Sequence, residues 1–157
     1  MDENSRDAYL YKGIKGWLLL LCITLTILDP VSMLLNLFAA SNLAKPFFET
    51  HKNLFNLILV SGILTIGLII FSIYAGLCLW RLTANAVSIA KKYFKSIFVY
   101  SAVAIFLPDI FGVSEDIYKK IGGNHVLNSL ITMCYAIAWY IYLSKSKRVR
   151  FTYNHNP

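Results

Sequence analysis

Charged side chains are scarce in this chain of 157 residues: Asp, Glu, Lys and Arg make up 15% of it, whereas 57% of the residues are hydrophobic. A water-soluble domain has about 25% charged and roughly 45–50% apolar residues. The composition therefore excludes a soluble globule and a disordered chain, and it leaves too little polar surface for a nucleic-acid binder. A membrane protein is the class that remains.

Motifs that carry chemistry are also missing. Cys22, Cys78 and Cys134 form no Cys-x-x-Cys or zinc-like spacing, so the sequence predicts neither a disulfide framework nor a zinc site. It contains no glycine-rich phosphate loop, nucleophile elbow or His/Glu zinc helix. We therefore expect no catalytic residues, no cofactor and no enzyme activity.

Long uncharged runs are what the sequence does contain. Residues 54–80 include no charged side chain or histidine over 27 positions, and residues 126–144 include none over 19. At about 1.5 Å per residue, each run can cross a hydrocarbon core of roughly 30 Å as a helix. Two further apolar segments are interrupted, one by Asp29-Pro30 and the other by Pro108-Asp109. We interpret each as one helix that continues through its pair, because backbone polar groups in lipid must be satisfied within the segment.

The sequence thus predicts an all-α integral membrane protein with a single domain over residues 1–157. Its four transmembrane helices form a compact bundle. The expected spans are approximately residues 15–41, 54–80, 93–113 and 126–144, followed by a basic cytoplasmic tail over residues 145–157. A cleaved signal peptide in place of the first span is less favoured, because the flank is mixed in charge and Asp29 interrupts the apolar run.

Basic residues are distributed unevenly between the connections. The N-terminal segment, the connection after the second span and the C-terminal tail together hold 11 of the 15 Lys and Arg residues. The positive-inside rule then places both termini in the cytoplasm. The net charge of +7 thus divides into roughly +8 on the inner side and −1 on the outer side, and the inner charge favours an anionic inner leaflet. The basic flank of the last span consists of Lys145, Lys147, Arg148 and Arg150. Nucleic-acid binding by this flank is the less favoured interpretation.

Small residues mark a helix-packing face in the second span. Ser61, Thr65, Ser72 and Gly76 recur on one narrow face of a helix. Small side chains let transmembrane helices approach closely. We expect this face to pack within the bundle, and an interface between two copies is the alternative.

Asp29 and Asp109 are the acids whose position requires an explanation, because a charge in a bilayer costs about 2.5–3.5 kcal/mol. Each follows a lysine by 14 residues, which predicts that both carboxyls lie roughly 21 Å from the inner surface, in the outer third of the membrane. The adjacent proline opens the carbonyl four residues back, so the two acids are candidate cation or proton ligands. The alternative is a helix that kinks or ends near the interface. The interfacial alternative is favoured for Asp109, whereas for Asp29 the two interpretations are equally supported.

The outer connections predict little chemistry. Their titratable residues are Glu49, His51, Glu115, Asp116 and His125. No pair among them has ligand spacing on a clear helix, so we expect no metal site. Residues 114–121 are expected to form a short interfacial helix with Ser114 as its N-cap.

Two segments carry a resemblance to a known family. They are Gly-Trp-Leu-Leu-Leu at residues 16–20 and the aromatic helix end with its basic exit at residues 139–153. With four spans in about 150 residues, the chain resembles the bacterial inner-membrane family catalogued as domain of unknown function 2569. The resemblance implies a multi-pass protein of the bacterial cytoplasmic membrane with four helices. It brings no established activity or site residues.

We therefore expect a non-enzymatic accessory or interaction protein that packs against itself or a larger membrane-protein complex. The alternative is a small oligomeric transporter or channel that uses Asp29 and Asp109 as cation or proton ligands. The lipid bilayer is the first expected partner, and nucleic acid is not expected.

Overall fold

The computed structural model describes residues 13–113 and 124–153, and within these ranges the chain forms helices and no strand. The elements are α2 (Trp17–Ile23), the π-helix η1 (Thr24–Leu28), α3 (Asp29–Ala44), the 3-10 helix η2 (Lys45–Phe47), α4 (Lys52–Trp80), α5 (Ala86–Ile110), α7 (His125–Lys145) and α8 (Lys147–Tyr153). Four stretches are long and apolar enough to cross a membrane: Trp17–Phe47, Lys52–Trp80, Ala86–Ile110 and His125–Lys145. The expectation of an all-helical protein with four membrane-spanning helices is confirmed.

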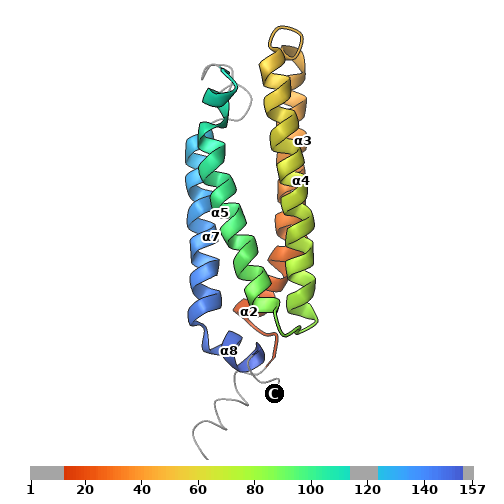
Figure 1. Cartoon of the computed structure of the whole chain (residues 1–157). Coiled ribbons are helices and arrows are strands. Elements are labelled where there is room, and N and C mark those ends of the chain that lie inside the picture. Colours follow the sequence, from red (N-terminus) through yellow and green to blue (C-terminus); the bar gives the residue numbers. More distant parts are fainter. Residues whose placement is uncertain (1–12, 114–123, 154–157) are drawn as a thin grey trace, which may run out of the picture.

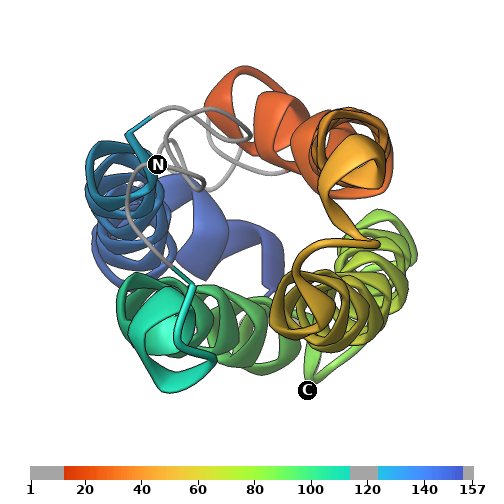
Figure 2. The ribbon, with the colours of Figure 1, turned by 90° about the horizontal axis from the view of Figure 1, so that it is seen from above.

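The four long helices pack in chain order around a ring, as the view along the bundle shows (Figure 2). α3 packs on α4, α4 on α5 and α5 on α7, whereas α3 makes little contact with α7. The α3–α4 pair and the α5–α7 pair lie close together near α8 and separate toward the other end (Figure 1). We call the end that carries α8 the α8 end, and the end that carries η2 the tip end.

The first span is continuous although Pro30 lies inside it. Pro30 occupies the first turn of α3, where a missing N–H group is tolerated. The turn before it widens to a π-helix, and the N–H of Asp29 donates to the carbonyl of Thr24, five residues back. A π-turn of this kind absorbs the disruption locally.

Two separate hydrophobic clusters hold the helices together. The larger lies toward the α8 end and includes the fully buried side chains of Leu21, Leu25, Leu79, Tyr93 and Phe94. The smaller lies toward the tip end and consists of Ala44, Leu54, Leu57, Leu107 and Val113 with partly buried neighbours. The buried core is therefore divided into two clusters, one toward each end of the bundle.

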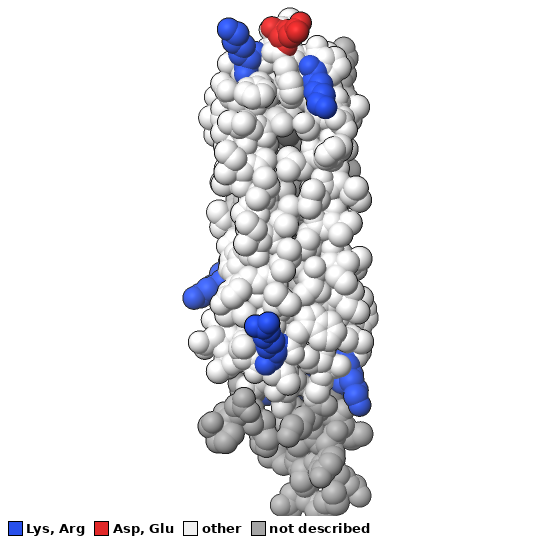
Figure 3. All heavy atoms as spheres, turned by 90° about the vertical axis from the view of Figure 1, so that its right-hand side faces the viewer, with Lys and Arg blue, Asp and Glu red and all other residues white. Residues whose placement is uncertain are grey.

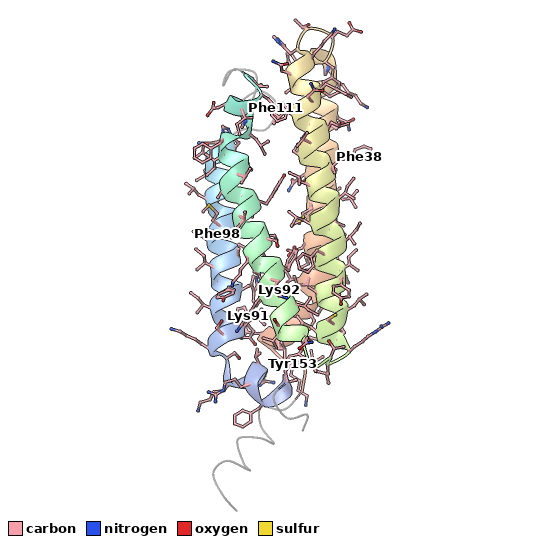
Figure 4. The ribbon with its side chains drawn as sticks, viewed as in Figure 1. Phe38, Lys91, Lys92, Phe98, Phe111 and Tyr153 are labelled. Atoms are coloured by element: carbon pink, nitrogen blue, oxygen red, sulfur yellow. The ribbon has the colours of Figure 1, made fainter. Side chains whose placement is uncertain are left out.

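The third span begins earlier than expected. α5 begins at Ala86, seven residues before the expected start at residue 93. Lysines do not end this helix, because their long side chains carry the charge away from it: the Nζ atoms of Lys91 and Lys95 lie 5.8 and 5.6 Å from the ring centroid of Tyr140. Lys91 and Lys92 mark this early part of α5 in Figure 4.

The expected basic tail is in part a helix docked on the bundle. α8 turns beneath the bundle (Figure 1), where Val149 is buried and the hydroxyl of Tyr153 donates to the carbonyl of Leu79 at 2.8 Å. The N–H of Gly13 donates to Oγ1 of Thr152 at 3.2 Å, so both ends of the described chain meet here. The expected interfacial helix over residues 114–121 lies outside the described residues, as do Glu115, Asp116 and the last four residues of the tail.

Candidate functional site: a carboxylate between the helices

Asp29 lies at the point where the two helix pairs meet. Its side chain is buried, with 8% of its surface exposed. Oδ1 accepts a hydrogen bond of 2.8 Å from the hydroxyl of Tyr135 in α7, and Oδ2 accepts one of 3.0 Å from the hydroxyl of Tyr93 in α5. One carboxylate thus joins α3 to both α5 and α7. An ionised carboxylate only accepts hydrogen bonds, so two phenolic donors match it.

Aromatic rings hold the two tyrosines in place. Tyr93 contacts Phe71 and Phe94 edge to face, with ring centroids 5.7 and 5.2 Å apart. Tyr135 contacts Phe94 at 6.0 Å and Trp139 at 6.5 Å in the same manner. Such contacts fix ring orientation. The two hydroxyls are therefore pre-positioned around Asp29.

Asp29 has no cationic partner among the residues that the structure describes. Its side-chain partners there are the two tyrosines alone. Lys91 and Lys95 of α5 lie over the ring of Tyr140 instead. Intramembrane acids usually pair with a base or line a path for ions or protons. Chemically, this carboxylate can accept a proton, or it can bind a small cation together with the phenolic oxygens.

The carbonyl that Pro30 leaves open is occupied. Because of the π-turn, this carbonyl belongs to Leu25, five residues before Pro30, and not to the residue four positions back. The Oγ of Ser72 donates to it at 2.8 Å. The expectation that the proline frees an acceptor for a cation is therefore wrong for this carbonyl, since a hydroxyl from α4 satisfies it.

The expected packing face of α4 divides between two neighbours. Ser72 and Gly76 lie against η1, where a Cβ atom added to Gly76 meets Cγ2 of Thr26 at 2.5 Å. Thr65 instead shares a hydrogen bond of 3.2 Å with the hydroxyl of Tyr100 in α5. The hydroxyl of Ser61 donates to Leu57 of its own helix at 2.8 Å.

Asp109 does not join Asp29. It is exposed in the last turn of α5, 16 residues beyond Tyr93, which corresponds to about 24 Å along the helix. The expectation of equal depth is wrong, because Lys95 lies well inside α5 and does not mark where that helix begins. Asp29 lies about 18 Å from the start of its span and about 27 Å from its end, on the α8 side of the middle.

The other expected sites have these positions. Within residues 13–113 and 124–153, no three His, Cys, Asp or Glu side chains gather into a group that could hold a metal ion. Lys145 ends α7, and Lys147, Arg148 and Arg150 belong to α8. Cys22 and Cys78 are buried, whereas Cys134 is exposed.

The hydrogen-bond donors of Asp29 were not predicted from the sequence, although the sequence restricts which residues they can be. A buried carboxylate needs donors at its own level, and the neighbouring spans offer few hydroxyl or amide groups there. Tyr93 is the first residue of the expected third span and precedes Lys95, which was expected to mark the entry of that helix. The sequence therefore predicts Tyr93 at the membrane surface and not at the depth of Asp29. Tyr135 fits an interfacial aromatic belt equally well. Placing Asp29 at its observed depth is what identifies both tyrosines as its hydrogen-bond donors and not as surface residues.

Over residues 11–154 the chain matches the family described as "Protein of unknown function (DUF2569)". No curated protein and no solved structure matches the chain. The match covers nearly the whole chain and includes both segments that carry the resemblance. The chain therefore belongs to the DUF2569 family.

Proposed function

We propose that this protein is a non-enzymatic membrane protein in which Asp29 takes up a proton or a small monovalent cation, as part of a small oligomeric transporter or channel. The observation that carries the proposal is the buried carboxylate of Asp29, held by Tyr93 and Tyr135 and without a cationic partner in the described residues. Asp109 has no part in this site. It is exposed at the end of α5, and it serves as a matched control.

A purely structural link would not require a carboxylate. A hydroxyl or amide at position 29 can also bond to tyrosines, without the cost of about 2.5–3.5 kcal/mol for a charge in the bilayer. What a carboxylate adds is the ability to exchange a proton or a counter-ion. The bonds to two different helices also mean that a change of charge at Asp29 is transmitted directly to α5 and α7.

An accessory or interaction role is the second candidate, and a groove on the surface favours it. An open groove of about 330 Å³ runs between α3 and α4. Its lining includes Leu34, Leu37 and Phe38 from α3 and Ile58, Gly62 and Ile66 from α4. The lining is apolar and includes a glycine, so an apolar side chain of a larger membrane-protein complex, or of a second copy, fits such a surface.

We place both termini in the cytoplasm of a bacterial cell and the four spans in its inner membrane. The distribution of charge supports this orientation. Nine of the eleven Lys and Arg residues in the described ranges lie toward the α8 end, and Lys45 and Lys52 lie at the tip end. Figure 3 shows a face with basic side chains toward both ends and an uncharged band between them. The α8 end then faces the anionic inner leaflet.

Flux in liposomes tests the proposed function. The purified protein is reconstituted with an internal pH-sensitive dye, and in parallel with dyes for sodium and potassium, and a membrane potential is imposed. We expect the wild type to carry protons or one of the cations, Asp29→Asn to lose roughly an order of magnitude or more of the flux, and Asp109→Asn to retain it. Asp29→Glu, which keeps the carboxylate, is expected to retain part of the flux.

Wild-type flux no greater than that of empty liposomes, or equal flux in Asp29→Asn and the wild type, contradicts the transport proposal. Native mass spectrometry of the same preparation tests the second candidate. A foreign membrane protein bound in fixed stoichiometry supports the accessory role, and a homo-oligomer with flux supports transport.

A further inference from the structure

Two asparagines lie at the same spacing from the two residues of the Asp29–Tyr135 hydrogen bond. Asn36 follows Asp29 by seven residues in α3, and Asn128 precedes Tyr135 by seven residues in α7. Seven residues make almost two full turns, so each asparagine lies on the same face as its reference residue, about 10.5 Å along the helix. Because α3 and α7 run in opposite directions, both displacements are toward the tip end. Asn36 and Asn128 therefore form a second polar level above the first.

The same level receives polar groups from the other two long helices. Tyr100 follows Tyr93 by seven residues in α5 and shares a hydrogen bond of 3.2 Å with Thr65 in α4. All four long helices thus contribute an amide or a hydroxyl at one height. The level contains no charged group among the described residues.

The two asparagines are exposed, although they belong to membrane-spanning helices. Among the described residues, neither side chain has a hydrogen-bond partner, in contrast to Asp29 and Tyr135 one level below. α3 and α7 make little contact, and the two helix pairs separate toward the tip end (Figure 1). A primary amide without a partner is unfavourable in hydrocarbon. Water between α3 and α7 would remove that penalty.

We propose that Asn36, Thr65, Tyr100 and Asn128 line a water-filled passage that opens toward the tip end between α3 and α7 and leads protons or hydrated monovalent cations to Asp29. The inference rests on the proposed function, since it supplies the route to that carboxylate. Neutral amide and hydroxyl oxygens suit a cation that keeps part of its hydration. The negative end point at Asp29 disfavours anions. The passage stops there, because the larger hydrophobic cluster closes the bundle toward the α8 end. It opens on the side of α3 and α7, because the smaller cluster joins α3 and α4 to the end of α5 on the other side of the tip end.

Cysteine accessibility tests the passage. Asn36→Cys and Asn128→Cys are made in a Cys134→Ala background, because Cys22 and Cys78 are buried and Cys134 is exposed. The proteins are placed in lipid nanodiscs, so that water reaches both membrane surfaces, and are treated with a water-soluble cationic methanethiosulfonate. Phe38→Cys is the matched control, since Phe38 is 67% exposed on the outer side of the same helix (Figure 4). Only the thiolate reacts, and a thiolate forms in water and not in hydrocarbon.

We expect both asparagine positions to react faster than Phe38→Cys by roughly an order of magnitude or more. Rates as slow as that of the control overturn the passage. So do oxidative disulfides between Asn36→Cys chains of two copies, because a second copy then covers this face. Where a variant fails to elute as a folded species, Ser32→Cys on the same side of α3 replaces it.

The outcomes separate this inference from the proposed function. Flux that depends on Asp29 together with unreactive cysteines retains the function and overturns the passage. Reactive cysteines without any flux retain the passage and overturn transport.

Discussion

The hydroxyl of Ser72 donates a hydrogen bond of 2.8 Å to the main-chain carbonyl of Leu25, 47 residues away in the sequence. In the π-turn, the partner of this carbonyl five residues ahead is Pro30, which has no N–H. The N–H of Asp29, four residues ahead, donates to Thr24. Ser72 thus supplies the hydrogen bond that the proline removes, and α4 holds the irregular turn that precedes the functional carboxylate.

Replacing Ser72 by Ala is therefore expected to destabilise the protein more than the same change at Ser61. Ser72→Ala leaves the Leu25 carbonyl without a donor in a buried position. Ser61→Ala removes a bond to a carbonyl of its own helix. We expect a loss of about 0.5–2 kcal/mol for Ser72→Ala and little for Ser61→Ala, measured by thermal unfolding in detergent. Equal losses would show that the Leu25 carbonyl does not depend on Ser72.

Gly76 allows α4 to approach η1, and a methyl group there is expected to be costly. A Cβ atom would lie 2.5 Å from Cγ2 of Thr26 and 3.1 Å from its main-chain nitrogen. Thr26 cannot rotate freely, because its hydroxyl donates to the carbonyl of Cys22 at 2.7 Å. We expect Gly76→Ala to lower the free energy of unfolding by about 1–3 kcal/mol. Gly67→Ala is the control, since a Cβ atom there meets nothing within 4 Å, and it is expected to be neutral or slightly stabilising. The reverse order of the two melting temperatures contradicts the close approach.

Removing one phenolic hydroxyl from Asp29 is expected to destabilise the bundle. Tyr135→Phe and Tyr93→Phe each leave one carboxylate oxygen without its donor, at a cost of about 1–3 kcal/mol. Tyr140→Phe is the matched control, because its ring faces Lys91 and Lys95 and phenylalanine retains that face. Denaturation of the three variants in the same detergent checks the prediction. The same Tyr135→Phe change is then made in the Asp29→Asn background. If it no longer lowers the free energy of unfolding there, its effect in the wild type arises from the hydrogen bond to the carboxylate.

The docking of α8 is expected to depend on pH through Tyr153. Burial raises the pKa of this phenol above its ordinary value of 10.0, and the proximity of Cys22 and Tyr142 acts in the same direction. A pKa that is higher in the docked state means that the stabilisation is complete below pH 10 and is lost as the pH rises through the raised value. A spin label at Arg150→Cys, in the Cys134→Ala background, should become mobile only at strongly alkaline pH. An identical alkaline transition in Tyr153→Phe would assign it to another group.

Labelling of intact cells tests the proposed orientation. Thr50 is exposed at the tip end and Arg150 is exposed in α8. We expect a membrane-impermeant maleimide to label Thr50→Cys in intact cells and to label Arg150→Cys only after the cells are opened, with Cys134→Ala as the background. The opposite pattern places the termini outside.

Composition and uncharged runs suffice to predict four helices, because the thickness of a bilayer limits where an apolar run begins and ends. α4 and α7 accordingly begin and end within a few residues of the expected spans. The start of α5 is not predictable in this way, since Lys91, Lys92 and Lys95 are basic residues inside the helix and not at its boundary.

Asp29 is recognisable from the sequence because an acid in an apolar run is costly. Its two hydrogen-bond partners are not recognisable from the sequence. Tyr93 and Tyr135 lie 64 and 106 residues further along the chain, and which tyrosine reaches the carboxylate depends on the relative heights of three helices. Pro30 likewise signals an irregular turn but does not specify a π-turn. Gly76 of another helix packs closely against this turn, and that contact cannot be read from the local sequence.

The Asp29 site can form only after the last span has been synthesised. The ribosome completes the first span before Tyr93 and long before Tyr135, so Asp29 enters the membrane when neither of its hydrogen-bond donors exists. Until α5 and α7 arrive, the first two spans must hold an unpartnered acid. The site is thus complete only when Tyr135 of the last span reaches Asp29 of the first.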